Sequence, residues 1–298
     1  MMQPEHIGIY SALLSAASWA LGAILFKKIS ENVSPLGMTL AKGLIGTFLL
    51  GLVYYFEGIS MLSSRVLIIL FISGIIGISI GDTLFFMSLK NLGAKTQVIL
   101  LMLGQVITAI FGVIIFKEYP TTIQYVGIVL ILIGVASVLW KKIRSYSSNI
   151  STSIRGVIYG FLSIILFSLS LVLVKSAMSE VSTIGAAFYR IMAGTIGMII
   201  FGLFGNNMKD WVMPFKGNMK MISFFIMSVT VIMFGGFWLS LVAIKYVNIG
   251  VASALNATEP LFVLPLAYYI MKEKIEKIEI FGAICTVVGV FLLTIYSI

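Results

Sequence analysis

Apolar stretches long enough to cross a lipid bilayer follow one another along almost the whole chain. A bilayer's hydrocarbon core is about 30 Å thick, which an α-helix spans with about 20 residues. Because the stretches are apolar on all sides, they favour helices over the shorter, alternating strands of a membrane barrel. The ten candidate spans are Ile7–Phe26, Leu36–Phe56, Val66–Leu89, Val98–Phe116, Ile123–Trp140, Gly156–Val174, Ile184–Phe204, Ile222–Ile244, Ile249–Met271 and Ile280–Ile298.

The composition agrees with a membrane location. Hydrophobic residues make up 60% of the 298 positions and charged residues 10%, whereas a soluble domain has about a quarter of its residues charged. Disordered chains combine low hydrophobicity with high charge, so they are excluded as well. We therefore predict an all-α integral membrane protein that crosses the lipid bilayer many times.

Residues that carry enzyme chemistry are scarce. The chain has one cysteine, Cys285, and one histidine, His6, so neither a disulfide framework nor a Cys/His metal site is expected. It contains no G-x-x-x-x-G-K-[ST] phosphate-binding loop. We predict no catalytic residues, no cofactor and no metal. The net charge of +9 is interpreted as the lysine and arginine bias of cytoplasmic loops, not as a nucleic-acid site.

The chain repeats itself at two constant offsets. Because each half holds five spans, an odd number, the second half must cross the membrane in the opposite sense. We therefore predict ten transmembrane helices in two inverted five-helix repeats, residues 1–149 and 150–298, an arrangement that many secondary transporters use for alternating access. An offset of 148 residues relates Gly8 to Gly156, Lys27 to Lys175, Ser34 to Ser182, Gly37 to Gly185 and Thr47 to Thr195, and an offset of 155 relates Gly81 to Gly236, Lys90 to Lys245, Glu118 to Glu273, Gly127 to Gly282 and Gly134 to Gly289.

Several segments resemble the EamA-type branch of the drug/metabolite transporter superfamily, and the resemblance covers essentially the whole chain. The segments that show the resemblance are SWALGAILFKK in the first span, GDTLFFMSLKNLGA across the third and NATEPLFVLPLAYYIMKE in the ninth. The resemblance implies ten helices in two inverted halves around a central cavity. It also implies transport of amino acids and other small metabolites, with export favoured over uptake. The Glu-Pro of the ninth span has no counterpart in the fourth, where Gly104-Gln105 stands.

Four charged residues lie well inside the predicted spans: Lys42, Asp82, Arg190 and Glu259. Charges in a membrane are costly and usually face a cavity or a partner. Depths counted at about 1.5 Å per residue place Lys42 and Asp82 toward the membrane side opposite the N-terminus. Arg190 lies toward the N-terminal side, and Glu259 lies nearer the middle. We expect the pairs Lys42–Asp82 and Arg190–Glu259 to line a substrate cavity or its gates. The alternative is that they are permanent ion pairs that only fix helix packing.

Other candidate ligand-binding residues are aromatic or amide side chains deep in the spans. Trp19 and Trp238 are unusual because tryptophan prefers the membrane interface; they are expected to line the cavity or to fill helix contacts. Gln105 and Asn256 are expected to bind ligand or to hydrogen-bond neighbouring helices. Near Glu259, the prolines at 260 and 265 remove backbone donors, which suits a bent helix. Glu118 and Glu273 are expected to neutralise helix ends or nearby lysines.

Loop charge predicts the orientation. Outside the spans, 14 lysines and arginines fall on the side opposite the N-terminus and 4 on the N-terminal side. The positive-inside rule then places both termini outside the cytoplasm of a cell (plasma) membrane. The family resemblance implies the reverse, with both termini in the cytoplasm.

The sequence therefore predicts a secondary transporter of a small-molecule substrate, with amino acids or related zwitterions as the leading class. Glu259 and Asp82 are the candidates for proton coupling. Two alternatives stay open: a translocase for lipids or hydrophobic drugs, and a non-transporting membrane sensor or scaffold. An enzyme is the least expected class, and the oligomeric state is not predicted.

Overall fold

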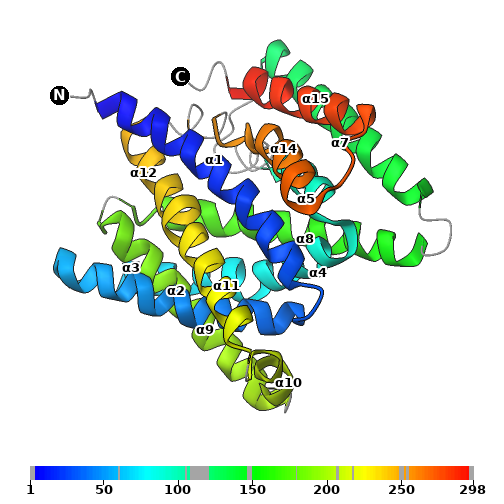
Figure 1. Ribbon diagram of the computed structural model, residues 1–298. Helices are drawn as coiled ribbons and strands as arrows, with labels where there is room; N and C mark the ends of the chain where they lie inside the picture. Colours follow the sequence, from blue (N-terminus) through cyan, green and yellow to red (C-terminus); the bar gives the residue numbers. More distant parts are fainter. Residues whose placement is uncertain are drawn as a thin grey trace.

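A computed structural model describes residues 4–59, 61–104, 106–107, 121–145, 150–178, 180–205, 208–216, 218–247, 252 and 255–294. The described parts are helices joined by short connections, with no strands among them (Figure 1). The helices of the first half are α1 (Pro4–Ile29), α2 (Pro35–Glu57), α3 (Ser64–Gly74), η1 (Ile75–Gly81), α4 (Asp82–Leu92), α5 (Ala94–Leu101) and α7 (Thr122–Ser145). Those of the second half are α8 (Ile150–Lys175), α9 (Thr183–Gly205), α10 (Met208–Val212), η3 (Met213–Phe215), α11 (Met219–Thr230), η4 (Val231–Trp238), α12 (Leu239–Tyr246), α14 (Glu259–Met271) and α15 (Lys277–Thr294).

Within the described residues, seven helical segments are long and apolar enough to cross a membrane. They match seven of the predicted spans, and α14 and α15 overlap the ninth and tenth. Of the fourth predicted span, Val98–Phe116, α5 covers only the first four residues, and residues 105 and 108–116 lie outside the described residues. The seven are His6–Ile29, Pro35–Glu57, Ser64–Leu92, Thr122–Lys141, Thr152–Val174, Thr183–Phe204 and Met219–Ala243. Figure 1 shows the beginning of α1 and the end of α15 on the same side of the molecule.

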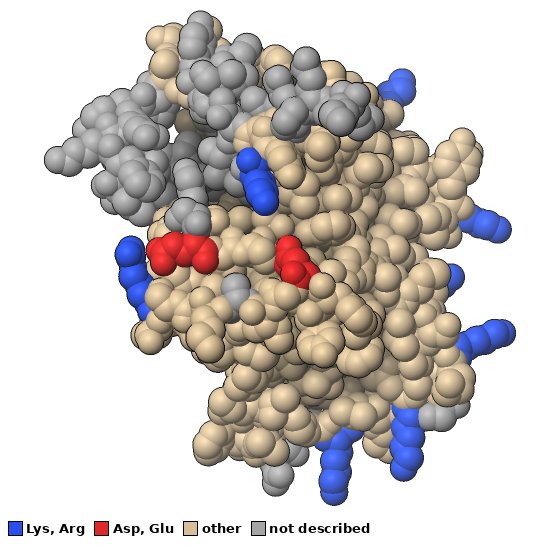
Figure 2. Space-filling view, turned by 90° about the vertical axis from the view of Figure 1, so that its left-hand side faces the viewer, with Lys and Arg blue, Asp and Glu red and all other residues tan. Residues whose placement is uncertain are grey.

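The outer surface is apolar, as a lipid environment requires. Large hydrophobic side chains such as Phe48, Phe56 and Phe204 are mostly exposed. The face seen in Figure 2 carries few charged side chains, and lysines and arginines project from its rim.

The predicted repeat is visible in local structure. Ser34 caps α2 by accepting a hydrogen bond from Gly37 N at 3.1 Å, and Ser182 accepts one from Gly185 N at 3.1 Å before α9. A serine that satisfies a free N–H group of the first turn is a favoured helix start. In addition, a π-helical turn, η1 or η4, interrupts the third long helix of each half.

Each half packs its first helix against the third helix of the other half. In the first half, α1 lies along η4 and α12, and in the second half α8 lies along η1 and α4 (Figure 1). The close contacts are repeat-equivalent: a Cβ on Gly22 would collide with Ile232, and a Cβ on Gly77 would collide with Ser170. Small residues thus let the helices approach closely, as in many membrane proteins.

The last helices of the two halves also pack together through glycines. A Cβ on Gly134 of α7 would lie 2.7 Å from the carbonyl oxygen of Gly282 in α15. A Cβ on Gly289 of α15 would lie 2.6 Å from the carbonyl oxygen of Gly127 in α7. The offset of 155 converts the first contact into the second, so the two helices meet about a local two-fold relation.

Candidate functional site

The first buried charge cluster joins α2 to the start of α4. Lys42 and Asp82 are 5% and 8% exposed, and they form a hydrogen-bonded ion pair. The π-helical η1 ends directly before Asp82. The Thr83 hydroxyl donates to the Ser79 carbonyl at 2.7 Å and lies 3.1 Å from the Thr39 hydroxyl. The expected contact between Lys42 and Asp82 is therefore present.

Arg190 of α9 is held by two serines and an aromatic ring. Its Nε donates to Ser73 Oγ of α3 at 2.9 Å, and its Nη2 donates to Ser170 Oγ of α8 at 3.0 Å. The serines bond reciprocally, each hydroxyl donating to the other's backbone carbonyl at 2.9 and 2.8 Å. The Arg190 guanidinium carbon lies 5.1 Å from the centre of the Phe237 ring, within reach of a cation–π interaction.

The expectation that Arg190 pairs with Glu259 is wrong. Within the described residues no ion pair joins them; Asp82 is the carboxylate whose charge acts on Arg190. The reason is helix packing: α9 lies against α2, α3 and η1, whereas α14, which begins at Glu259, lies mainly against α1 and α5. Arg190 and Glu259 were paired by their expected depth in the membrane, but residues at similar depth on different helices need not be in contact.

Phe237 occupies the position that Asp82 has in the other half, since the offset of 155 relates the two. Lys42 and Arg190 are related by the offset of 148. Each cation thus contacts the equivalent position on the third long helix of its own half. Lys42 meets the Asp82 carboxylate there, and Arg190 meets the Phe237 ring. Sequence reasoning missed Phe237, although the offset was the signal that could have found it.

Glu259 stands apart from the other charges. It is 9% exposed at the start of α14, and among the described residues it has neither an ion pair nor a hydrogen bond to its side chain. Close by in the sequence, Asn256 Oδ1 is sealed from solvent and has no hydrogen-bond partner among the described residues. Pro260 lies in the first turn of α14, where its missing N–H costs nothing, and Pro265 lies inside the helix.

Trp19 and Trp238 lie in helix contacts and are only partly buried. Trp19 Nε1 donates to Ser240 Oγ of α12 at 3.2 Å, and the Trp19 ring packs where Gly236 leaves room. Trp238 packs edge-on against Phe234, with ring centres 6.4 Å apart. Both border the largest hydrophobic cluster. Gln105 and Glu118 lie outside the described residues.

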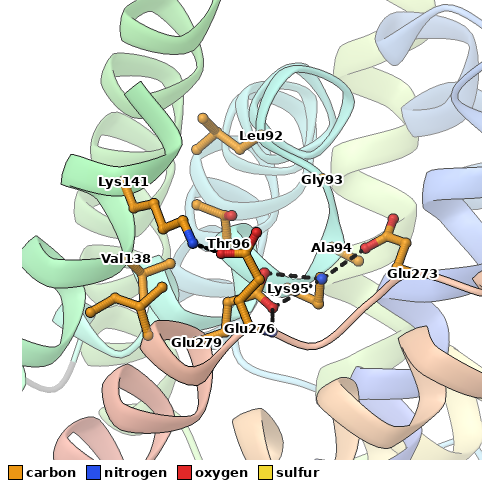
Figure 3. Close-up of a pocket in the computed structure, with 11 residues that line it drawn as sticks. Leu92, Gly93, Ala94, Lys95, Thr96, Val138, Lys141, Glu273, Glu276 and Glu279 are labelled. Atoms are coloured by element: carbon orange, nitrogen blue, oxygen red, sulfur yellow. Dashed lines mark hydrogen bonds and ion pairs between the residues drawn. The ribbon is translucent and has the colours of Figure 1, made fainter. Parts of the chain in front are cut away.

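A cavity of about 290 Å³ lies at the end of the molecule where the α4–α5 turn meets the segment between α14 and α15 (Figure 3). Lys95 Nζ lies 3.2 Å from Glu273 Oε2, 3.0 Å from Glu279 Oε1 and 3.0 Å from the Lys274 carbonyl oxygen. Lys141 forms a third ion pair at the cavity, with Glu276. Glu273 thus neutralises a lysine as expected. The other lining charges were not predicted, because loop charges have many possible partners.

The described residues contain no group of three or more histidine, cysteine or acidic side chains that could hold a metal ion.

Both halves of the chain resemble a known protein family. The model of the EamA-like transporter family matches residues 6–140 and again residues 154–295. A protein of known crystal structure matches with a TM-score of 0.56 at 15% identity, over 99% of this chain and 97% of the other, which shows a shared fold. No curated protein matches the sequence.

Proposed function

Because the chain belongs to the EamA-like transporter family, a family of multi-pass membrane transporters, we propose that it is a secondary transporter for small organic metabolites that works by alternating access. Amino acids or related zwitterions are the substrate class we assign. Export is the direction that the family likeness favours.

The proposed architecture is ten transmembrane helices in two inverted five-helix repeats, residues 1–149 and 150–298. The family model matches the chain twice, once in each half. The beginning of α1 and the end of α15 lie on the same side, which fits an even number of crossings (Figure 1). The reciprocal packing of α1 on α12 and of α8 on α4 also fits a two-fold relation between the halves.

The observation that carries the proposal is the position of the buried charges where the two halves meet. Arg190 belongs to the second half, and one of its serine partners, Ser73, belongs to the first. Lys42 and Asp82 lie on α2 and α4, which pack against α9 and α8 of the second half. Inverted-repeat transporters hold substrate near mid-membrane between their repeats, so a rocking motion there would open the site to either side.

Mixed charge supports a zwitterionic substrate. Arg190 forms no ion pair within the described residues, and neither does Glu259. An amino acid carries one group of each sign, which matches the signs of these two charges, although Arg190 and Glu259 lie on helices with different neighbours. We further propose that the end carrying Lys95 and Lys141 is cytoplasmic in a cell membrane, as loop charge predicts.

Counterflow in proteoliposomes tests the transport proposal. Purified protein is reconstituted with unlabelled compound inside, and entry of the labelled compound is measured for amino acids, nucleosides and sugar phosphates. We expect protein-dependent exchange of amino acids, absent from liposomes without protein and from liposomes made with heat-unfolded protein. Absence of exchange for every compound, with protein that unfolds cooperatively on heating, would overturn the proposal in favour of a lipid translocase or a scaffold.

A further inference from the structure

We propose that Arg190 binds the carboxylate group of the transported molecule, whereas the repeat-equivalent Lys42 binds no ligand because Asp82 already neutralises it. This inference rests on the proposed transport function and deepens it: it assigns one chemical group of the substrate to one half of a pseudo-symmetric site.

The two serine contacts leave one edge of the planar guanidinium without a partner among the described residues. A guanidinium carries five N–H groups in a rigid planar arrangement. Arg190 uses its Nε–H with Ser73 and one Nη2–H with Ser170, which together form one edge of the plane. The outer fork, made by Nη1 and the second Nη2–H, has no partner among the described residues. A carboxylate matches such a fork with two parallel hydrogen bonds.

The unpartnered end of the Arg190 side chain is deeply buried but not fully sealed. Arg190 is 6% exposed, although it lies inside the bundle. In the described part of the chain, the side-chain atoms that are both sealed and without a partner are Gln97 Nε2 and Asn256 Oδ1. Arg190 Nη1 is not one of these atoms, so it is not fully sealed. Phe237 lies over the guanidinium and is itself only partly buried.

The local charge balance calls for one negative charge. Lys42 and Asp82 form an ion pair, and among the described residues no carboxylate lies within ion-pair distance of Arg190. Buried charges are expected to be paired. In the second half, Phe237 stands where the first half supplies Asp82, so this position does not provide a second carboxylate. A substrate carboxylate fills that role.

The chemistry favours a carboxylate over a phosphate. The Ser73 and Ser170 hydroxyl hydrogens are committed to backbone carbonyls, so the outer fork supplies the donors here. Two parallel N–H groups satisfy the two oxygens of a carboxylate, whereas a phosphate monoester has a third oxygen and up to two charges. Sugar phosphates and inorganic phosphate therefore serve as the competing ligands in the test.

The test compares ligands that differ in one group. Counterflow of a labelled amino acid is challenged with the unlabelled amino acid, with its amide and with the amine that lacks the carboxyl group. We expect competition by the amino acid and at least roughly tenfold weaker competition by the other two, since neither offers Arg190 a charged hydrogen-bond acceptor. Equal competition by all three, or stronger competition by inorganic phosphate, would overturn the carboxylate assignment while leaving transport intact.

Variants of the site give a second readout. Phe237→Asp supplies the carboxylate that the second half lacks, and Phe237→Asn is its uncharged control. We expect Phe237→Asp to abolish protection of the purified protein by the amino acid against thermal unfolding, without lowering the unfolding temperature below that of Phe237→Asn. Arg190→Gln should lose the same protection, and Arg65→Gln, at an exposed position, should keep it. Protection that persists in both Phe237→Asp and Arg190→Gln contradicts the proposal.

Discussion

The hydroxyl groups of Thr47 and Thr195 hydrogen-bond to each other at 3.1 Å, and the two residues are 148 residues apart, the offset that relates α2 to α9. Two positions related by an internal repeat can touch each other only where they lie beside the axis that relates the halves. The contact between Thr47 and Thr195 therefore marks that axis, and the buried cations Lys42 and Arg190 lie on the same two helices.

A disulfide at this contact should stop transport if the halves move against each other there. The chain's single cysteine is first removed as Cys285→Ser, and Thr47→Cys is then combined with Thr195→Cys. Side-chain oxygens 3.1 Å apart place the new sulfur atoms within bonding reach. We expect oxidation to abolish counterflow and reduction to restore it. The single-cysteine variants should be insensitive, and full flux in a cross-linked protein would show that the halves do not separate at this point.

The ion pair between Lys42 and Asp82 should matter for folding more than for substrate recognition. Lys42→Met leaves a buried carboxylate without its cation and is expected to lower the free energy of unfolding by about 3–5 kcal/mol. The double variant Lys42→Met/Asp82→Leu removes both charges and should recover much of this loss. Unfolding in detergent, followed by circular dichroism, measures the three proteins. A double variant as unstable as the single one would mean that the pair has a further partner.

The sequence predicted the repeat well because glycines, lysines and caps keep their spacing when a chain duplicates. Ser34 and Ser182 cap equivalent helices, and Gly134 and Gly289 make equivalent contacts. The Lys42–Asp82 pair was also predicted, since both residues lie at one depth on helices of one half.

The surroundings of Arg190 were not predictable in the same way. Its partners Ser73 and Ser170 meet only because α8 crosses from the second half to pack against α3 of the first. Small polar residues are common in membrane helices, so neither serine stands out in the sequence. Depth alone suggested Glu259 as the partner, and depth does not specify which helices are neighbours.

Glycines at the α7–α15 contact should be intolerant of a methyl group. A Cβ at position 134 would lie 2.7 Å from the Gly282 carbonyl oxygen and 2.8 Å from Thr286 Cγ2. Gly134→Ala should therefore separate the helices and lower the free energy of unfolding by roughly 1–3 kcal/mol. Gly104→Ala is the control, because its Cβ would meet Ile164 at an ordinary 3.5 Å. Equal unfolding temperatures for the two variants would contradict this close packing.

Glu259 is the residue we expect to couple transport to protons. It is a buried carboxylate without an ion pair in the described part of the structure, a group that can take up and release a proton during a transport cycle. Glu259→Gln should keep exchange at equal pH on both sides but lose accumulation driven by a pH gradient. Glu31→Gln, at an exposed position, should behave as the wild type. Accumulation in Glu259→Gln that still follows the gradient would exclude this role.

The ion pairs around the end cavity should hold that end closed. Lys95 and Glu279 have side chains 11% and 14% exposed, whereas Lys141 and Glu276 are 45% and 48% exposed. Exposed ion pairs contribute about 0–1 kcal/mol, so the Lys95 contacts should dominate. Thr96→Cys, in the Cys285→Ser background, reports access to the cavity through its rate of labelling by a membrane-impermeant thiol reagent. We expect Lys95→Ala to raise this rate several-fold and Lys141→Ala to change it little, since about 1 kcal/mol corresponds to roughly a fivefold change in an opening equilibrium. If both variants label at the wild-type rate, contacts other than these lysines close the cavity.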